Sequence, residues 1–248
     1  MNVDLGTAID SSRYEMIYQI VARDPAIGEE QFQTRILQFG NSAIKDSGYR
    51  YFRIDSVLWI RNEPTITMWD TQLIASSYGN IPGSTDGTEY LYQDGKWRIT
   101  NVIGPEGCMT YDTTANQEWE LLDDTAVVAG FECNKARTKF RGREWIVWYA
   151  PEIPYQAGPW KLGGLPGLIL KAESADGEYS MQAVLLRNSN DLIVRNRDKY
   201  KELKRDEFAR KHKDTHEYPF RRYEFNINGR HERYDERGFY NPIEKTLD

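Results

Sequence analysis

Histidine is the first residue type to consider for metal or acid–base chemistry, and the chain has three: His212, His216 and His231. A spacing of four would place His212 and His216 on one face of a helix, where they could bind zinc or copper with Asp214 or His231. Pro219 follows closely, however, and Asp214 is a poor helix former, so the helix is expected to end there. We therefore expect surface histidines, with no metal site and no cofactor.

Glu152 is the one carboxylate in an otherwise apolar, proline-rich stretch, and it could act as an acid or a base if it were buried. A carboxylate in such a place more often accepts hydrogen bonds from nearby backbone N–H groups. The chain contains no Gly-x-Ser-x-Gly elbow, no catalytic cysteine signature and no glycine-rich phosphate loop. The sequence thus identifies no catalytic residue, and an enzyme of unrecognised type using Glu152 is the alternative to a non-catalytic protein.

Aromatic residues gather around the same stretch. Residues 138–150 are predicted to form a strand that is apolar on both faces near its end, with Trp145 and Trp148 on opposite parities. One face must meet the core, and the other must meet a second layer or a ligand. We expect a functional surface near the end of this strand, and its predicted residues are Tyr149, Glu152, Tyr155 and Trp160, with Lys161 at the rim.

Composition limits the classes of function. The chain has 248 residues, with 32 Lys and Arg against 38 Asp and Glu, so its net charge is −6. This balance lacks the basic excess that nucleic-acid binding needs, and no partner of that kind is expected. The mean hydropathy is −0.71 and no run of 18 apolar residues occurs, so no transmembrane helix is predicted.

The pattern along the chain predicts a mainly β protein. Residues 14–21 and 31–39 indicate two neighbouring antiparallel strands, and Asp94-Gly95 and Asp176-Gly177 are typical hairpin turns between apolar alternations. We expect a curved antiparallel sheet or half-barrel with one or two covering helices, or an α+β fold as the fallback. The predicted organisation is one domain over residues 1–248, a disordered start over 1–12 and a surface helix over 199–213.

Residues 151–167 contain four prolines and four glycines between two predicted strands, which indicates a long but rigid excursion of the backbone. The motif Gly164-Leu165-Pro166-Gly167 lies at its end. Because Pro166 fixes its own φ, at least one of the two glycines is expected to have a positive φ or to face closely packed backbone.

These residues carry a resemblance. The run from Gly164 to Ile169 reads GLPGLI and is similar to the signature of the GLPGLI family, as are the segments 151–154 and 158–161 before it and 130–136 and 140–143 upstream. The resemblance covers roughly residues 85–245. It implies a Bacteroidetes-type cell-envelope protein of unassigned activity, exported by a cleaved leader, in a mature form that begins at Met1.

The implied function is that of a non-catalytic periplasmic or envelope protein, with the signature region binding a ligand or an outer-membrane transporter. The ligand could be a lipid or a peptide, and the protein partner could also be another envelope protein. In an oxidising envelope Cys108 and Cys133 could form a disulfide, and two independent buried thiols are the alternative.

Overall fold

The structure is a computed structural model. It describes residues 6–53, 56, 87–101, 107–112, 117–195, 200–219, 224–227, 230–233 and 236–247.

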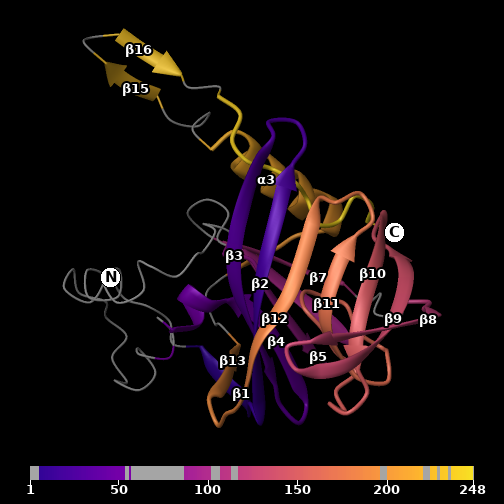
Figure 1. Cartoon of the computed structure of the whole chain (residues 1–248). Coiled ribbons are helices and arrows are strands. Elements are labelled where there is room, and N and C mark those ends of the chain that lie inside the picture. Colours follow the sequence, from indigo (N-terminus) through magenta and orange to yellow (C-terminus); the bar gives the residue numbers. More distant parts are fainter. Residues whose placement is uncertain are drawn as a thin grey trace.

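The elements follow one another as an almost unbroken series of strands (Figure 1). The first seven are β1 (Thr7–Ser11), β2 (Tyr14–Asp24), β3 (Glu29–Phe39), β4 (Ala43–Gly48), β5 (Glu89–Gln93), β6 (Lys96–Asn101) and β7 (Cys108–Asp112). The next seven are β8 (Glu120–Val128), β9 (Phe131–Phe140), β10 (Arg143–Ala150), β11 (Leu168–Ser174), β12 (Tyr179–Asn188), β13 (Leu192–Arg195) and β14 (Lys201–Glu202). Helix α3 (Arg205–Glu217) follows, and then β15 (Glu224–Ile227) and β16 (Arg230–Arg233).

Twelve of these strands form one sheet in the order β14-β7-β6-β5-β4-β3-β2-β12-β11-β10-β9-β8. Every pairing in it is antiparallel except that of β14 with β7. Over the described residues the sheet is not closed into a barrel. The predicted fold class, a large antiparallel sheet with little helix, is confirmed.

The sheet is strongly curved, and one ion pair demonstrates it. Asp112 ends β7, near one edge of the sheet, whereas Arg141 lies in the turn between β9 and β10, near the other edge. Arg141 Nη2 nevertheless donates to Asp112 Oδ1 over 2.6 Å. The sheet must therefore bend until its two ends meet on one side, which encloses the main hydrophobic core.

The centre of the sheet joins the beginning and the later part of the chain. Strand β2 pairs with β3 on one side and with β12 on the other, so that Tyr14 lies opposite Asn188. The small β1–β13 sheet repeats this long-range pairing, with Thr7 opposite Arg195. Residues 1–12 were expected to be disordered, and this expectation is wrong for Thr7–Ser11, which pair with β13; residues 1–5 lie outside the described part.

Both predicted hairpins are present. The turn at Asp94-Gly95 joins β5 to β6, and the turn at Asp176-Gly177 joins β11 to β12. Asp94, Gly95 and Gly177 all have positive φ. Tight hairpin turns require this conformation, and Asp and Gly adopt it more readily than most residues.

The helix expected over residues 199–213 lies further along the chain. It spans Arg205–Glu217, and Lys201–Glu202 form β14 instead. Its buried apolar residue is Phe208. Among the described residues no helix is long and apolar enough to cross a membrane.

The proline- and glycine-rich excursion folds into the curve of the sheet. Trp160, Leu162 and Leu165 are buried in the main core, and Ala157 pairs with Gly163 to close the excursion on itself. Gly164 and Gly167 both have positive φ, at 85° and 155°, which confirms the expectation for these glycines. A Cβ on Gly167 would lie 2.3 Å from the carbonyl oxygen of Ala150, so the backbones touch here.

The two cysteines are free and buried, so the predicted disulfide is wrong. Cys108 belongs to a small core under α3, whereas Cys133 belongs to the main core. Eight strands of the sheet lie between β7 and β9, which carry them. Burial raises the pKa of the Cys133 thiol, which keeps it in the unreactive, protonated form.

Candidate functional site

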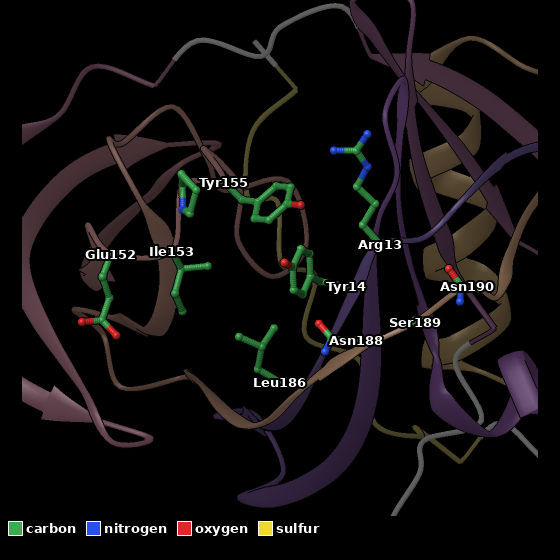
Figure 2. A pocket seen from close by; sticks show the side chains of 10 residues that line it. Arg13, Tyr14, Glu152, Ile153, Tyr155, Leu186, Asn188, Ser189 and Asn190 are labelled. Atoms are coloured by element: carbon green, nitrogen blue, oxygen red, sulfur yellow. The ribbon is translucent and has the colours of Figure 1, made fainter.

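A groove of about 630 Å³ opens where the start of β2, the end of β12 and the proline-rich excursion meet (Figure 2). We call it the tyrosine groove. Its lining residues are Arg13, Tyr14, Glu152, Ile153, Pro154, Tyr155, Leu186, Asn188, Ser189 and Asn190. The volume lies within the range of small-molecule binding sites in proteins.

Two tyrosines form the middle of the groove. The rings of Tyr14 and Tyr155 meet edge to face with their centroids 5.6 Å apart, and Tyr155 packs on Phe39 at 4.9 Å. Burial raises the pKa of Tyr155 further above its usual range, and the protonated phenol can donate a hydrogen bond. Tyr14 is 37% exposed and offers its ring to solvent.

Polar groups lie at both ends of the groove. Figure 2 shows Glu152 on the far side of Ile153 from the tyrosines, and Arg13 and Asn190 at the opposite end. Glu152 is exposed and is the single carboxylate among the described residues that line the groove. Aromatic rings can pack against the apolar face of a ligand ring, and the surrounding amide, guanidinium and carboxylate groups can bind hydroxyl groups at its edge.

The β12 wall of the groove is held by a buried carboxylate. Glu15 is fully buried and accepts hydrogen bonds from Arg187 Nε and Nη2, at 2.8 and 2.6 Å. The hydroxyl of Ser12 donates to that of Ser189, which ties the β2 side to the groove lining.

Asp191 adds a second carboxyl to this network. Burial and the neighbouring charge of Glu15 raise the pKa of Asp191. Glu15 and Asp191 could not be recognised as neighbours from the sequence, because they are 176 residues apart and meet only through the pairing of β2 with β12.

The structure separates the residues that the sequence grouped as a functional surface. Glu152 and Tyr155 line the groove, whereas Tyr149 and Trp160 are buried in the main core. Trp160 has a φ of 59°, and its backbone N–H donates to Asp46 Oδ2 over 2.7 Å. Asp46 on β4 thus compensates a backbone conformation that bulky residues rarely adopt.

Lys161 is not at a rim, as the sequence analysis expected, but inside the protein. Its ammonium donates to Asp112 Oδ2 and pairs with Glu244, and its side chain has no exposed surface. Arg141 and Arg205 also contact Asp112, at 2.6 and 2.8 Å. Burial lowers the pKa of Lys161, against the opposing effect of the two carboxylates. These five residues form a buried ion cluster that joins β7, the excursion, α3 and the C-terminal segment.

The histidines of α3 lie together but do not gather metal ligands. The rings of His212 and His216 stack with centroids 4.1 Å apart, and His216 Nδ1 contacts the carbonyl oxygen of His212. Within the described part of the chain, no group of three or more His, Cys, Asp or Glu side chains could hold a metal ion.

Comparison with known proteins gives the context of this geometry. A family model described as "N-glycanase peptide, N-terminal domain" matches residues 97–211. Two crystal structures entitled "Structure of PNGF-II" superpose with TM-scores of 0.53 and 0.52 at 17% identity, covering 81% of this chain. The chain shares its fold with part of PNGF-II. It spans about a third of those proteins, 33% and 32% of their chains.

These matches overturn the resemblance drawn from the GLPGLI motif. The family model that fits is that of an N-glycanase domain, and it includes residues 164–169 within its match. The non-catalytic transporter-binding function that the motif implied is therefore wrong, and the enzyme alternative agrees better with the matches. The search of curated proteins gave no match.

Proposed function

We propose that this chain is part of an enzyme of the N-glycanase type. Its tyrosine groove binds the glycan of a glycosylated peptide. The observation that carries the proposal is the lining itself, in which the exposed ring of Tyr14 stands between a carboxylate at one end and amide groups at the other. The matching family model and the fold shared with PNGF-II support this class of substrate.

The chemistry of a sugar explains the arrangement. The ring C–H groups of a pyranose form an apolar face that can pack on Tyr14, and its hydroxyl and acetamido groups can pair with Asn188 and Glu152. Hydrolysis of the bond between glycan and peptide consumes one water, so it needs one group that accepts a proton from the water and one that donates a proton to the leaving group. Glu152 is the single carboxylate among the described residues that line the groove. Glu152 is therefore proposed as one member of such a pair, and the second member is proposed to be a residue that does not line the groove.

The test is a titration of the protein with N,N′-diacetylchitobiose, the sugar pair at the reducing end of N-linked glycans, followed by calorimetry. The Tyr14→Ala variant should weaken binding by about twofold to about twelvefold, because a ring packed on an aromatic face contributes about 0.5–1.5 kcal/mol. Phe32→Ala is the matched control, since Phe32 is 56% exposed on β3 and does not line the groove.

A glycosylated peptide, followed by mass spectrometry, separates recognition from catalysis. If the chain releases the glycan, Glu152→Gln should lower kcat more than it raises KM. Equal affinity of Tyr14→Ala and wild type for the disaccharide would contradict the proposal.

A further inference from the structure

A second opening shares no lining residue with the tyrosine groove. It has a volume of about 400 Å³ and lies between strands β5–β7, helix α3 and the C-terminal segment 240–247. We call it the α3 cleft. Its volume lies within the range of small-molecule binding sites in proteins.

Helix α3 forms one wall of the cleft. One face of α3 turns Phe208, Ala209 and His212 toward the cleft, at the spacing of one helical stripe. Phe208 is the buried apolar residue of this helix, and beside it the small side chain of Ala209 leaves room that a larger residue would fill.

The facing walls are largely apolar. Tyr90, Ile99 and Thr110 lie directly opposite one another on β5, β6 and β7 and form one row across the sheet. Ile243 and Leu247 close the third side from the C-terminal segment. A ligand that fills the cleft must therefore have an apolar body.

The charges around the cleft have mostly one sign. Its lining contains four cationic side chains, Arg205, Arg210, Lys213 and Lys245, against the single carboxylate of Glu244. Arg205 belongs to the buried ion cluster, and Lys245 pairs with Asp176 and Glu178. Lys213 lies 3.7 Å from Glu217, and Arg210 is exposed on the helix, so these two are the cations nearest to solvent. A negatively charged head group would be attracted to this rim.

We propose that the α3 cleft binds an amphipathic anion, a molecule with a single alkyl chain and a carboxylate or phosphate head. Phe208 and Ile99 pack together in the small core under α3, so the alkyl chain lies beside them, between Ala209 and the C-terminal residues Ile243 and Leu247. The head group pairs with Arg210 and Lys213. This site is separate from the tyrosine groove, so the proposal stands independently of the glycan-binding function.

Calorimetric titration with decanoate, decyl phosphate and decanol tests the proposal, because the three share one chain and differ in the head. Decanoate, decyl phosphate or both should bind at least tenfold more tightly than decanol, and the tighter of the two identifies the head group. Ala209→Phe fills the cleft from the helix and should abolish binding, with Ala209→Met as the smaller filling variant if the first does not fold. Asp206→Leu adds an apolar side chain to an exposed position of α3 outside the lining and should bind as wild type.

The double variant Arg210→Gln with Lys213→Gln tests the head-group contact. It should weaken binding of the anion by about tenfold or more and leave decanol unchanged. Undiminished anion binding by a folded Ala209 variant, or equal affinity for decanoate, decyl phosphate and decanol, would overturn the proposal. Retained chitobiose binding by Ala209→Phe would show that the two sites are independent.

Discussion

The ammonium of Lys161 donates a hydrogen bond to Asp112 Oδ2 over 2.5 Å, although the two residues lie 49 positions apart and both are shut off from solvent. Replacing Lys161 by Met would leave the carboxylates of Asp112 and Glu244 buried with one cation fewer. We expect a loss of about 3–5 kcal/mol in the free energy of unfolding, measured by urea denaturation.

The control for this variant is Lys135→Met. Lys135 pairs with Asp124 over 2.9 Å, but Asp124 is 69% exposed, so the loss should stay below about 1 kcal/mol. Equal losses for Lys161→Met and Lys135→Met would show that the cluster does not stabilise the fold beyond a surface ion pair.

Gly167 and Gly177 form a matched pair for a test of backbone packing. Both have positive φ, but a Cβ on Gly167 would lie 2.3 Å from the Ala150 oxygen, whereas a Cβ on Gly177 meets nothing within 4 Å. Gly177→Ala should cost about 1 kcal/mol of unfolding free energy, from the conformation alone. Gly167→Ala should cost about 3 kcal/mol or more, because the backbone must also move. Similar urea midpoints for the two variants would refute the close approach.

Asp176 should contribute to the acid sensitivity of the protein. Burial opposes ionisation, but hydrogen bonds from Ser174 and Lys245 prevail and hold the pKa of Asp176 well below its usual range. A lowered folded-state pKa means stability that is present above the unfolded pKa, near 3.9, and lost as the pH falls below it. The urea midpoint of wild type should therefore fall between about pH 5 and pH 2, and that of Asp176→Asn should fall less steeply. Parallel curves would contradict this assignment.

The cysteines provide a simple chemical test of the core. Iodoacetamide should leave Cys108 and Cys133 unmodified in the native protein, because both are buried, and should label both in about 6 M guanidinium. Mass spectrometry counts the added groups. A protein that takes up no label when unfolded without reductant would contain a disulfide.

The parts of the fold that could be predicted depend on local chemistry. Asp94-Gly95 and Asp176-Gly177 identify their hairpins because the turn itself demands these residue types. The rigid excursion was predictable for the same reason, from its prolines and glycines. Glu152 and Tyr155 were named as site residues because they stand out within that excursion, and they do line the groove.

Long-range partners could not be predicted in the same way. A lysine is expected at a surface, and nothing near Lys161 in the sequence indicates that Asp112 and Glu244 will enclose it. The other side of the groove comes from Tyr14 and Asn188, which meet only because β2 pairs with β12. The GLPGLI motif describes a tight backbone segment, and the same segment can occur in proteins of different function.

The pairing of β2 with β12 also has a consequence for how the protein is made. Strand β2, in the middle of the sheet, pairs with β3, which follows it directly in the sequence. Its other partner, β12, is complete only when residue 188 has been synthesised. Until then, β2 has an edge without a backbone partner, which can pair with strands of other nascent chains. When the first 178 residues have been synthesised, β2 therefore still lacks its partner strand β12. Slow translation before β12 should lower the yield of folded protein.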